Sequence, residues 1–363
     1  MSIHYSDLFI SGQGSYHTYR IPALVPGPEN TVLAFCEGRK HGQGDAGQID
    51  LLLRIGRGGD PVFGEQKVIV SEPGMTSGNP APIYDPDTGT VHLLFCKNED
   101  RRGEGAVIAE NAPRTVWYTR STDGGENWTE PAEITVMVKR PDWSWYATGP
   151  GHGIKLASGR FIIPCDHIRR VQGSRDDPYH SHIIYSDDAG ESWHIGGIAD
   201  DGTNECTAVQ TEAGELCLNC RNKYIPGEWE KHRAVAWSRD GGETLSPAVH
   251  DAFLPDPVCQ AALLHLPGDG KSKAAELFAA PRPLSAVNRG RHNLTVYLSS
   301  DGARTWPLRK TLFCGPAAYS DLAVLPGKAG EEQLLCLFEN GRFSPYEALT
   351  LAVFNREWVA GRE

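Results

Sequence analysis

One short motif, Ser-x-Asp-x-Gly-x-x-Trp, recurs four times in this chain of 363 residues. The copies begin roughly 50 to 65 residues apart, at Ser121, Ser186, Ser238 and Ser299. The third has Leu in place of Trp, and the fourth has Ala in place of Gly. Each copy follows a strand-like run, and its Asp and Gly favour a tight turn because Asp can bond nearby backbone and Gly tolerates a positive φ. A turn that recurs in phase with strands predicts a repeat architecture, in which we expect the motif's Trp to pack against the next strand.

The rest of the chain alternates strand-like runs with polar turns. Examples of these runs are 31–36, 49–54, 91–96, 216–219 and 333–338, and the sequence contains 40 Gly and 25 Pro. Many short strands separated by turns predict an all-β fold of four-stranded blades arranged radially, a β-propeller. At roughly sixty residues a blade, the length allows a six-bladed β-propeller. No linker divides the chain, so we expect a single domain over residues 1–363.

Charge and composition limit the class of partner and the location. A net charge of −11 argues against nucleic acid as the main partner. A local arginine cluster can still bind an anionic small molecule, because charges are screened within about 8 Å in physiological salt. No apolar run is long enough to cross a membrane. No secretory signal is visible and the nine Cys are interpreted as reduced, mostly buried thiols, so a cytoplasmic location is expected, with removal of a signal left open.

Three arginines lie where short strands are expected to end: Arg20, Arg221 and Arg291. Strands from different blades of a propeller converge on one axis, so these side chains can meet there. A guanidinium group presents a planar fork of donors that matches a carboxylate. Taken singly, each arginine is more often a surface ion-pair partner. Taken together with the motifs that follow, they predict a site for an anionic ligand.

The ordered set of motifs resembles the exo-α-sialidases of glycoside hydrolase family 33. It consists of Arg20-Ile-Pro22 near the start, the repeated Asp turn, and Tyr319-Ser-Asp-Leu322 near the end, and it spans nearly the whole chain. The resemblance implies a six-bladed propeller that removes terminal sialic acid from glycoconjugates without a metal or organic cofactor. The implied partners are sialylated glycans, oligosaccharides or glycolipids, without nucleic acid or stable membrane insertion, and the short loops favour a monomer.

The resemblance assigns Arg20, Arg221 and Arg291 to a clamp on the carboxylate of sialic acid. Arg291 is preferred to Arg289 because it stands directly before a strand-like run and the fourth Asp turn. Glu339, which ends a strand-like run, resembles the carboxylate that orients the first arginine.

Further positions resemble the rest of the family's site. Asp45 lies among glycines and resembles the acid/base Asp on a mobile loop, whereas the nearby Asp50 belongs to a strand pattern and is expected to point elsewhere. Glu37 and Arg39 resemble a Glu-x-Arg pair, in which the arginine contacts the carboxylate or the C4 hydroxyl of the sugar. Asn79 resembles the Asn of an Asn-Pro-x-Pro stretch beside the site.

Tyr319 and Glu205 resemble the nucleophile and its base. Sialidases with a tyrosine nucleophile are an exception among glycosidases. The reacting carbon of sialic acid already bears a carboxylate, which would repel a carboxylate nucleophile, whereas a neutral phenol avoids that repulsion. A phenol with a pKa near 10 needs a neighbouring base to take its proton. Asp45 would protonate the leaving oxygen, so we expect its pKa to rise as a drier site closes. The alternative for Tyr319 is a core residue bonded to Asp321.

The stretch 164–168 departs from the family pattern. Vertebrate cytosolic relatives carry Tyr residues there that face the sugar's glycerol tail, whereas this chain has Asp166, His167 and Ile168. The pockets for the tail and the N-acyl group are therefore open questions, as is a preference for the deaminated sugar or a trans-sialidase activity. A non-catalytic sialic-acid-binding propeller is the alternative from another class. The presence of Asp45, Glu205 and Tyr319 favours an enzyme, because a binding protein needs neither acid nor nucleophile.

Overall fold

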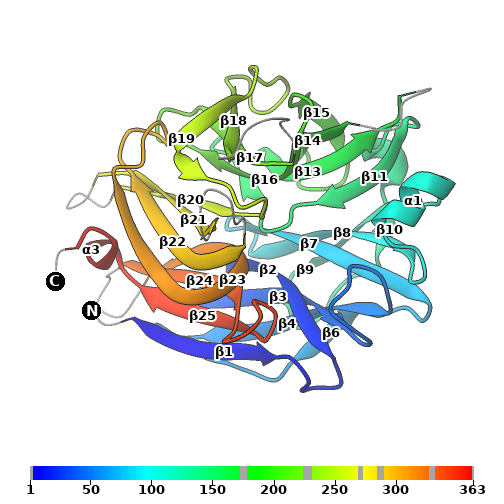
Figure 1. Ribbon diagram of the computed structural model, residues 1–363, viewed down its shortest axis with the longest axis horizontal. Coiled ribbons are helices and arrows are strands. Elements are labelled where there is room, and N and C mark those ends of the chain that lie inside the picture. Colours follow the sequence, from blue (N-terminus) through cyan, green and yellow to red (C-terminus); the bar gives the residue numbers. More distant parts are fainter. Residues whose placement is uncertain are drawn as a thin grey trace.

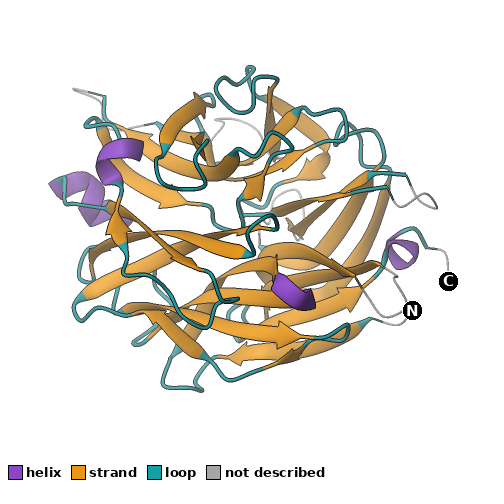
Figure 2. Cartoon of the chain, turned by 180° about the vertical axis from the view of Figure 1, so that it is seen from behind, coloured by secondary structure: helices purple, strands orange, loops and turns teal. Residues whose placement is uncertain are grey.

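The computed structural model describes residues 3–171, 178–223, 231–268, 273–283, 290–326 and 332–361. Its strands follow one another around the molecule in chain order (Figure 1), and helix is confined to a few short segments at the periphery (Figure 2). These segments are the 3-10 turn Pro28–Asn30, α1 (Glu104–Glu110), α2 (Thr135–Val138) and α3 (Arg356–Val359). The all-β prediction is confirmed. No helix in the described ranges is both long and apolar enough to cross a membrane.

Hydrogen bonds join the described strands into four sheets. The first sheet contains β2 (Thr18–Gly27), β3 (Thr31–Arg39), β4 (Ile49–Arg57), β5 (Val62–Phe63), β6 (Lys67–Val70), β7 (Met75–Asp85), β8 (Thr90–Glu99), β9 (Thr115–Ser121) and β10 (Ala132–Glu133). Its two halves meet at one parallel pair, Ile49 with Thr76.

Two smaller sheets follow. The five-stranded sheet contains β11 (Trp143–Thr148), β12 (Ile154–Lys155), β13 (Phe161–Arg169), β14 (Tyr179–Ser186) and β15 (His194–Ile198). The four-stranded sheet contains β16 (Thr203–Gln210), β17 (Leu216–Asn222), β18 (His232–Ser238) and β19 (Val249–Pro255).

The last sheet joins both ends of the described chain. It contains β20 (Ala262–Leu266), β21 (Ala275–Pro283), β22 (Arg291–Ser299), β23 (Leu308–Pro326), β24 (Glu332–Asn340), β25 (Ala348–Phe354) and β1 (His4–Ile10). The long β23 changes partner along its length, pairing with β22 up to Pro316 and with β24 from Ala317. β1 lies antiparallel to β25, with His4 opposite Val353. The first described strand thus becomes the outer strand of the last sheet.

All four copies of the repeated motif form the same turn. In the first copy the Ser121 hydroxyl donates to Asp123 Oδ1 at 2.8 Å and accepts from the backbone N–H of Gly125 at 2.8 Å. The equivalent Ser-to-Gly or Ser-to-Ala backbone contact is 2.8 Å in the second and third copies and 3.0 Å in the fourth. Gly125 has φ 93°, and even the substituting Ala303 has φ 60°, a conformation that disfavours any residue with a Cβ.

The tryptophans of these turns also join neighbouring groups of strands. Trp128 packs edge-on against Phe35 of β3 at 5.9 Å, and Trp193 packs against Tyr118 of β9 at 6.1 Å. Both tryptophans therefore contact the preceding group of strands, and Trp193 also shares a cluster with Ile195 and Ile198 of the strand that follows it. The buried apolar residues form clusters that draw members from successive groups of strands, so the core lies between neighbouring groups around the molecule. Burial of this apolar surface is the main favourable term in folding.

The cysteines agree with the sequence interpretation of their redox state. All nine are free thiols, and eight are buried. Cys314 is exposed.

Candidate active site

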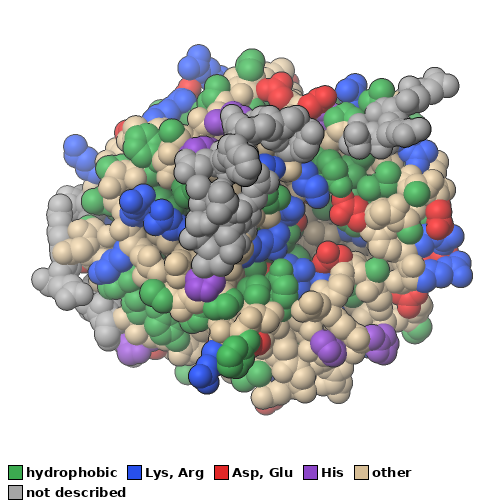
Figure 3. All heavy atoms as spheres, viewed as in Figure 1, with side chains coloured by type: hydrophobic (Ala, Val, Ile, Leu, Met, Phe, Trp, Pro, Cys, Tyr) green, Lys and Arg blue, Asp and Glu red, His purple; other side chains and the backbone are tan. Residues whose placement is uncertain are grey.

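A cavity of about 360 Å³ brings together residues from all four sheets. The face seen in Figure 3 is hollowed near its centre, where acidic and basic side chains gather. Nine of the ten predicted site residues line the cavity: Arg20, Glu37, Arg39, Asp45, Asn79, Glu205, Arg221, Arg291 and Tyr319. Glu339, the tenth, lies directly behind Arg20.

Glu339 fixes the first arginine. Its carboxylate accepts from Arg20 Nε at 3.0 Å and from Arg20 Nη2 at 3.3 Å, and it is fully buried. The same carboxylate accepts the backbone N–H of Ile21 at 3.0 Å and that of Tyr319 at 3.1 Å. One buried side chain at the end of β24 therefore sets the position of both Arg20 on β2 and Tyr319 on β23.

Arg291 approaches the same tyrosine from β22. Its Nη2 donates to the carbonyl of Val258 at 2.8 Å, and its Nη1 donates to the Tyr346 hydroxyl at 3.3 Å. The guanidinium carbon lies 5.3 Å from the ring centroid of Tyr319. The alternative arginine, Arg289, lies outside the described residues.

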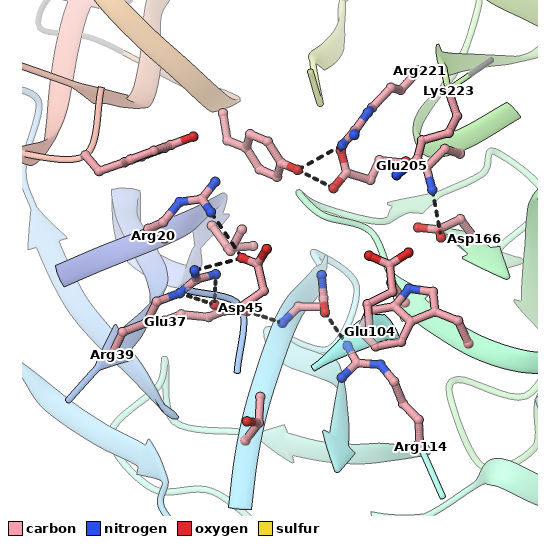
Figure 4. Close-up of a pocket in the computed structure, with 18 of the residues that line it drawn as sticks. Arg20, Glu37, Arg39, Asp45, Glu104, Arg114, Asp166, Glu205, Arg221 and Lys223 are labelled. Atoms are coloured by element: carbon pink, nitrogen blue, oxygen red, sulfur yellow. Dashed lines mark hydrogen bonds and ion pairs between the residues drawn. The ribbon is translucent and has the colours of Figure 1, made fainter. Parts of the chain in front are cut away.

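Tyr319 contacts a paired cation and carboxylate, Arg221 and Glu205, whose side chains lie next to each other in Figure 4. Its hydroxyl donates to Glu205 Oε1 and accepts from Arg221 Nη1 at 3.1 Å, and Arg221 also pairs with Glu205. Burial and then the charge of Glu205 raise the pKa of Tyr319 well above its ordinary value, although the arginines act the other way. Burial works against ionisation of Glu205, yet Arg221 and the hydrogen bond from Tyr319 lower its pKa overall. The resting pair is therefore a neutral phenol beside a carboxylate.

Neither of the two alternative carboxylates, Asp321 and Asp50, lines the cavity. Asp321 is buried and its Oδ1 lies 2.7 Å from Nδ1 of His152, so it is not the partner of the Tyr319 hydroxyl. Asp50 is also buried, accepts from the Tyr16 hydroxyl at 2.7 Å, and does not line the cavity.

Asp45 projects from the loop between β3 and β4 onto the arginines (Figure 4). Its Oδ1 accepts from Arg39 Nη1 at 2.8 Å and from Arg20 Nη1 at 3.1 Å, and its side chain is 70% exposed. Partial burial acts to raise the pKa of Asp45, but the charges of Arg39 and Arg20 outweigh it and lower that pKa. This direction is opposite to the rise expected for a closed site. In this structure Asp45 is an ionised partner of the clamp.

Glu37 and Arg39 form a second buried pair on β3. Glu37 Oε2 accepts from Arg39 Nε at 2.9 Å and Nη2 at 2.6 Å, while Oε1 accepts the backbone N–H of Asn79 at 2.8 Å. A Cβ on Gly78 would lie 2.5 Å from Glu37 Oε1, so only glycine permits this approach. The Glu37 carboxylate thereby links the Arg39 guanidinium to the backbone of β7.

Sequence reasoning missed Arg114, which lies just before β9. The residue is buried, its Nη2 donates to Asn79 Oδ1 at 2.6 Å, and its Nε donates to the carbonyl of Tyr146 at 2.6 Å. The guanidinium group stacks on Trp145 with 3.8 Å to the ring centroid. No motif surrounds Arg114 in the sequence, and it reaches the cavity only because these neighbouring segments fold around it.

The end of the cavity beyond Glu205 is lined by Asp166 of the stretch 164–168 and by three residues that sequence reasoning missed, Glu104, Asn204 and Lys223. Of the stretch that departs from the family pattern, only Asp166 lines the cavity. His167 is stacked on Trp143 at 3.5 Å and Ile168 is buried.

No group of three or more His, Cys, Asp or Glu side chains among the described residues is placed to hold a metal ion.

The chain is similar to known proteins over most of its length. Residues 31–330 match the BNR repeat-like domain. "Sialidase-3" of Bos taurus is 32% identical over 390 residues, which cover 93% of this chain and 89% of that protein. The "Sialidase" of Micromonospora viridifaciens is 29% identical over 98% of this chain but only 54% of its own length, so this chain spans about half of that relative. The solved structure of "Hadza microbial sialidase Hz136" superposes with a TM-score of 0.85 at 26% identity, covering 98% of this chain and 69% of that one.

Proposed function

Because this chain belongs to the exo-α-sialidases of the glycoside hydrolase 33 type, we propose that it releases terminal sialic acid with retention of configuration, through a covalent bond to Tyr319. The observation that carries the proposal is the Tyr319 hydroxyl, which contacts both Glu205 and Arg221 on the wall of an arginine-lined cavity. Sialylated glycans, oligosaccharides or glycolipids are the proposed substrates.

The substrate carboxylate binds to Arg20, Arg221 and Arg291, which places the anomeric carbon beside Tyr319. Glu205 takes the phenolic proton while the phenol oxygen attacks that carbon, and Asp45 gives a proton to the departing glycosidic oxygen. Asp45 then removes a proton from water, which attacks the same carbon from the side that the aglycone left. The tyrosine leaves and recovers its proton from Glu205. Two inversions at one carbon give overall retention.

Asp45 has to leave its arginine partners before it can act as an acid. Its Oδ1 accepts from Nη1 of Arg20, a donor that the substrate carboxylate also needs. Arrival of that carboxylate displaces Asp45 and neutralises part of the charge that keeps it ionised. The pKa of Asp45 then rises, as a general acid requires.

Substitution of Tyr319 by Phe tests the covalent step. The variant keeps the ring between the arginines but lacks the attacking oxygen, so we expect turnover of an aryl α-sialoside to fall by about 10³-fold or more. Binding of an unreactive sialic acid analogue should change little. Tyr297→Phe is the matched control, because Tyr297 is buried outside the cavity and its hydroxyl has no hydrogen-bond partner among the described residues. Near-normal turnover of Tyr319→Phe would rule out this nucleophile.

A trapping experiment identifies the intermediate directly. The Trypanosoma rangeli sialidase holds 2,3-difluorosialic acid as a covalent intermediate. We expect mass spectrometry to find the corresponding adduct on the peptide that contains Tyr319, and no adduct on Tyr319→Phe. If wild-type protein binds sialic acid but neither forms an adduct nor releases an aryl group, the non-catalytic binding propeller is the correct alternative.

We propose the deaminated sugar as a second candidate substrate. Arg114 and Asn79 form a polar surface beside Trp145 in the cavity wall. Such a surface suits a hydroxyl group as well as an N-acyl group. Comparing kcat/KM for aryl glycosides of the N-acetyl and deaminated sugars decides the preference, and adding lactose as an acceptor separates hydrolysis from transfer.

We also infer that residues 1–363 form one propeller domain of six blades, in which two of the four sheets each contain two blades. Six groups of strands support this: β2–β6, β7–β10, β11–β15, β16–β19, β20–β22 with the first half of β23, and the second half of β23 with β24, β25 and β1. The nine-stranded sheet then corresponds to two blades joined at the Ile49–Thr76 pair, and the seven-stranded sheet to two blades that share β23. A crystal structure with a blade number other than six would contradict it.

A further inference from the structure

The hairpin between β24 and β25 places one tyrosine against two of the three arginines that are proposed to bind the substrate carboxylate. The guanidinium carbon of Arg20 lies 4.2 Å from the ring centroid of Tyr346, and Nη1 of Arg291 donates to the Tyr346 hydroxyl at 3.3 Å. Tyr346 is half-buried and lines the cavity, but the proposed mechanism gives it no role. Arg20 lies on β2 and Arg291 on β22, so a single side chain contacts arginines from distant strands.

The backbone around Tyr346 is held by side-chain hydrogen bonds. The Glu347 carboxylate accepts three backbone N–H groups at 3.0, 2.8 and 2.9 Å, those of Arg342, Phe343 and Ser344. The hydroxyl of Ser11, which directly follows β1, donates to the carbonyl oxygen of Tyr346 at 2.8 Å. These bonds do not involve the cavity or a ligand. The hairpin therefore presents the tyrosine ring in a defined position before a substrate arrives.

Arg291 is the arginine that depends most on Tyr346. The other two arginines each form an ion pair with a glutamate. Among the described residues, no carboxylate lies within ion-pair distance of Arg291, and its hydrogen-bond acceptors there are the Val258 carbonyl and the Tyr346 hydroxyl. A neutral hydroxyl orients a guanidinium group without neutralising it. The charge of Arg291 therefore stays available to an anionic ligand.

The ring of Tyr346 restrains Arg20 in a direction that Glu339 leaves free. Two hydrogen bonds to Glu339 hold the Arg20 guanidinium group within its own plane. They oppose tilting out of that plane only weakly, because both are made at one edge of the group. An aromatic ring against the face of a guanidinium group attracts it and opposes the tilt. Glu339 and Tyr346 together therefore fix both the direction and the plane of Arg20.

We propose that Tyr346 is a positioning residue, which sets Arg20 and Arg291 relative to each other so that both reach the carboxylate of one substrate. The ring acts through Arg20, and the hydroxyl acts through Arg291. The inference rests on the proposed function and extends it, because it names a residue that prepares the anion-binding surface and was not among the ten predicted site residues. Loss of either contact lowers affinity for the substrate and leaves the nucleophile and the acid in place.

Two substitutions separate the two contacts. Tyr346→Phe removes the hydroxyl and keeps the ring, whereas Tyr346→Leu removes both. We expect KM for an aryl α-sialoside to rise by about 3-fold or more in the Phe variant and by about 10-fold or more in the Leu variant. The Kd for DANA, an inhibitor that the Trypanosoma rangeli sialidase binds, should rise by similar factors.

The division between KM and kcat distinguishes positioning from a merely structural role. Arginines that bind the carboxylate equally in the ground state and the transition state affect KM, so kcat should stay within about 2-fold of wild type. A variant that is partly unfolded instead shows a lower apparent kcat and an unchanged KM. Tyr185→Leu is the matched control, because the Arg160 guanidinium carbon lies 4.1 Å from the Tyr185 ring centroid and neither residue lines the cavity. Its KM and kcat should equal those of wild type.

A double-mutant cycle shows whether the hydroxyl acts through Arg291. Tyr346→Phe should lower kcat/KM by about 3-fold or more in the wild-type background, but by less than about 1.5-fold when Arg291→Ala is already present. An equal loss in both backgrounds would show that the hydroxyl contacts the substrate itself, and the positioning role would be wrong. If Tyr346→Leu does not fold, this cycle still decides the question, because both of its variants keep the ring.

The remaining outcomes are also decisive. An unchanged KM in Tyr346→Leu, at any value of kcat, would overturn the inference. Wild-type protein that neither hydrolyses the aryl sialoside nor binds DANA contradicts the proposed function instead, so the two failures are distinguishable.

Discussion

Glu339→Gln is expected to weaken both the fold and the site, because one carboxylate supports two elements. Glu339 is fully buried and accepts four hydrogen bonds, two from Arg20 and one each from the backbone of Ile21 and Tyr319. The amide replaces one acceptor oxygen by an NH₂ group that must face a donor. Arg20 is only 6% exposed, so its charge loses the buried partner that compensates for desolvation.

The size of the expected loss of stability follows from this burial. Breaking a buried ion pair by removing one partner costs about 3–5 kcal/mol. Asp45 also contacts Arg20, but its side chain is 70% exposed, and exposed pairs contribute at most about 1 kcal/mol. We therefore expect the free energy of unfolding to fall by about 3 kcal/mol or more in urea at pH 7. The kcat/KM for an aryl sialoside should fall by about 100-fold, since a misplaced Arg20 loses a charge-assisted contact to the substrate carboxylate.

Glu332→Gln is the matched control. Glu332 forms a similar two-point pair with Arg356, including a 2.9 Å contact to Nη2, and neither residue lines the cavity. Its side chain is 22% exposed, so we expect a loss of about 1 kcal/mol and unchanged kcat/KM. The reasoning is refuted if Glu339→Gln unfolds within about 1 kcal/mol of wild type and keeps kcat/KM within about 2-fold.

Two further predictions follow from the packing and charge of buried groups. Gly78→Ala places a Cβ 2.5 Å from Glu37 Oε1, so it should displace Glu37 from Asn79 and raise KM for the aryl sialoside. Gly64→Ala is the control, because its Cβ meets nothing closer than 3.8 Å and its KM should stay at the wild-type value. Equal KM values for the two variants would contradict this prediction. Burial lowers the pKa of His92 to about 4 from 6.5, so between these values the unfolded chain binds a proton that the folded chain does not. Stability should therefore fall as pH decreases through this window, by up to about 3 kcal/mol from this residue, and urea unfolding should show a flatter pH dependence for His92→Gln. Parallel curves between pH 7 and 5 would contradict the assignment.

The repeated turns could be predicted from sequence because their bonds are local. Ser121, Asp123 and Gly125 contact one another within five residues, and a Gly or Asp has the same conformational preference wherever it occurs. The direction in which Trp128 packs depends on a strand far earlier in the chain. Short-range reasoning therefore found the turn but not the contact between Trp128 and Phe35 of β3.

The residues of the candidate site also fall into two classes: those in local motifs, which the sequence predicts, and those that only the fold brings to the cavity. Arg20 and Tyr319 belong to recognisable motifs, and the structure brings them together as expected. Arg114 and Asp166 have no motif, and the sequence cannot say which face of its strand Asp166 presents. The pKa of Asp45 is lowered in this open arrangement by Arg39 and Arg20, contacts that only the folded loop supplies, and its rise in a closed, drier site stays a prediction.

The pairing of β1 with β25 has a consequence for biosynthesis. His4 leaves the ribosome long before Val353, its partner across the two strands. Arg20 likewise cannot pair with Glu339 until that residue, which lies 319 residues further along the chain, has been synthesised. A nascent chain thus carries an open sheet edge until both strands have been synthesised, a state prone to self-association. The contact between Arg20 and Glu339 forms only after Glu339 has been synthesised, so a chain that stops before Glu339 would have both an unpaired sheet edge and an incomplete cavity wall.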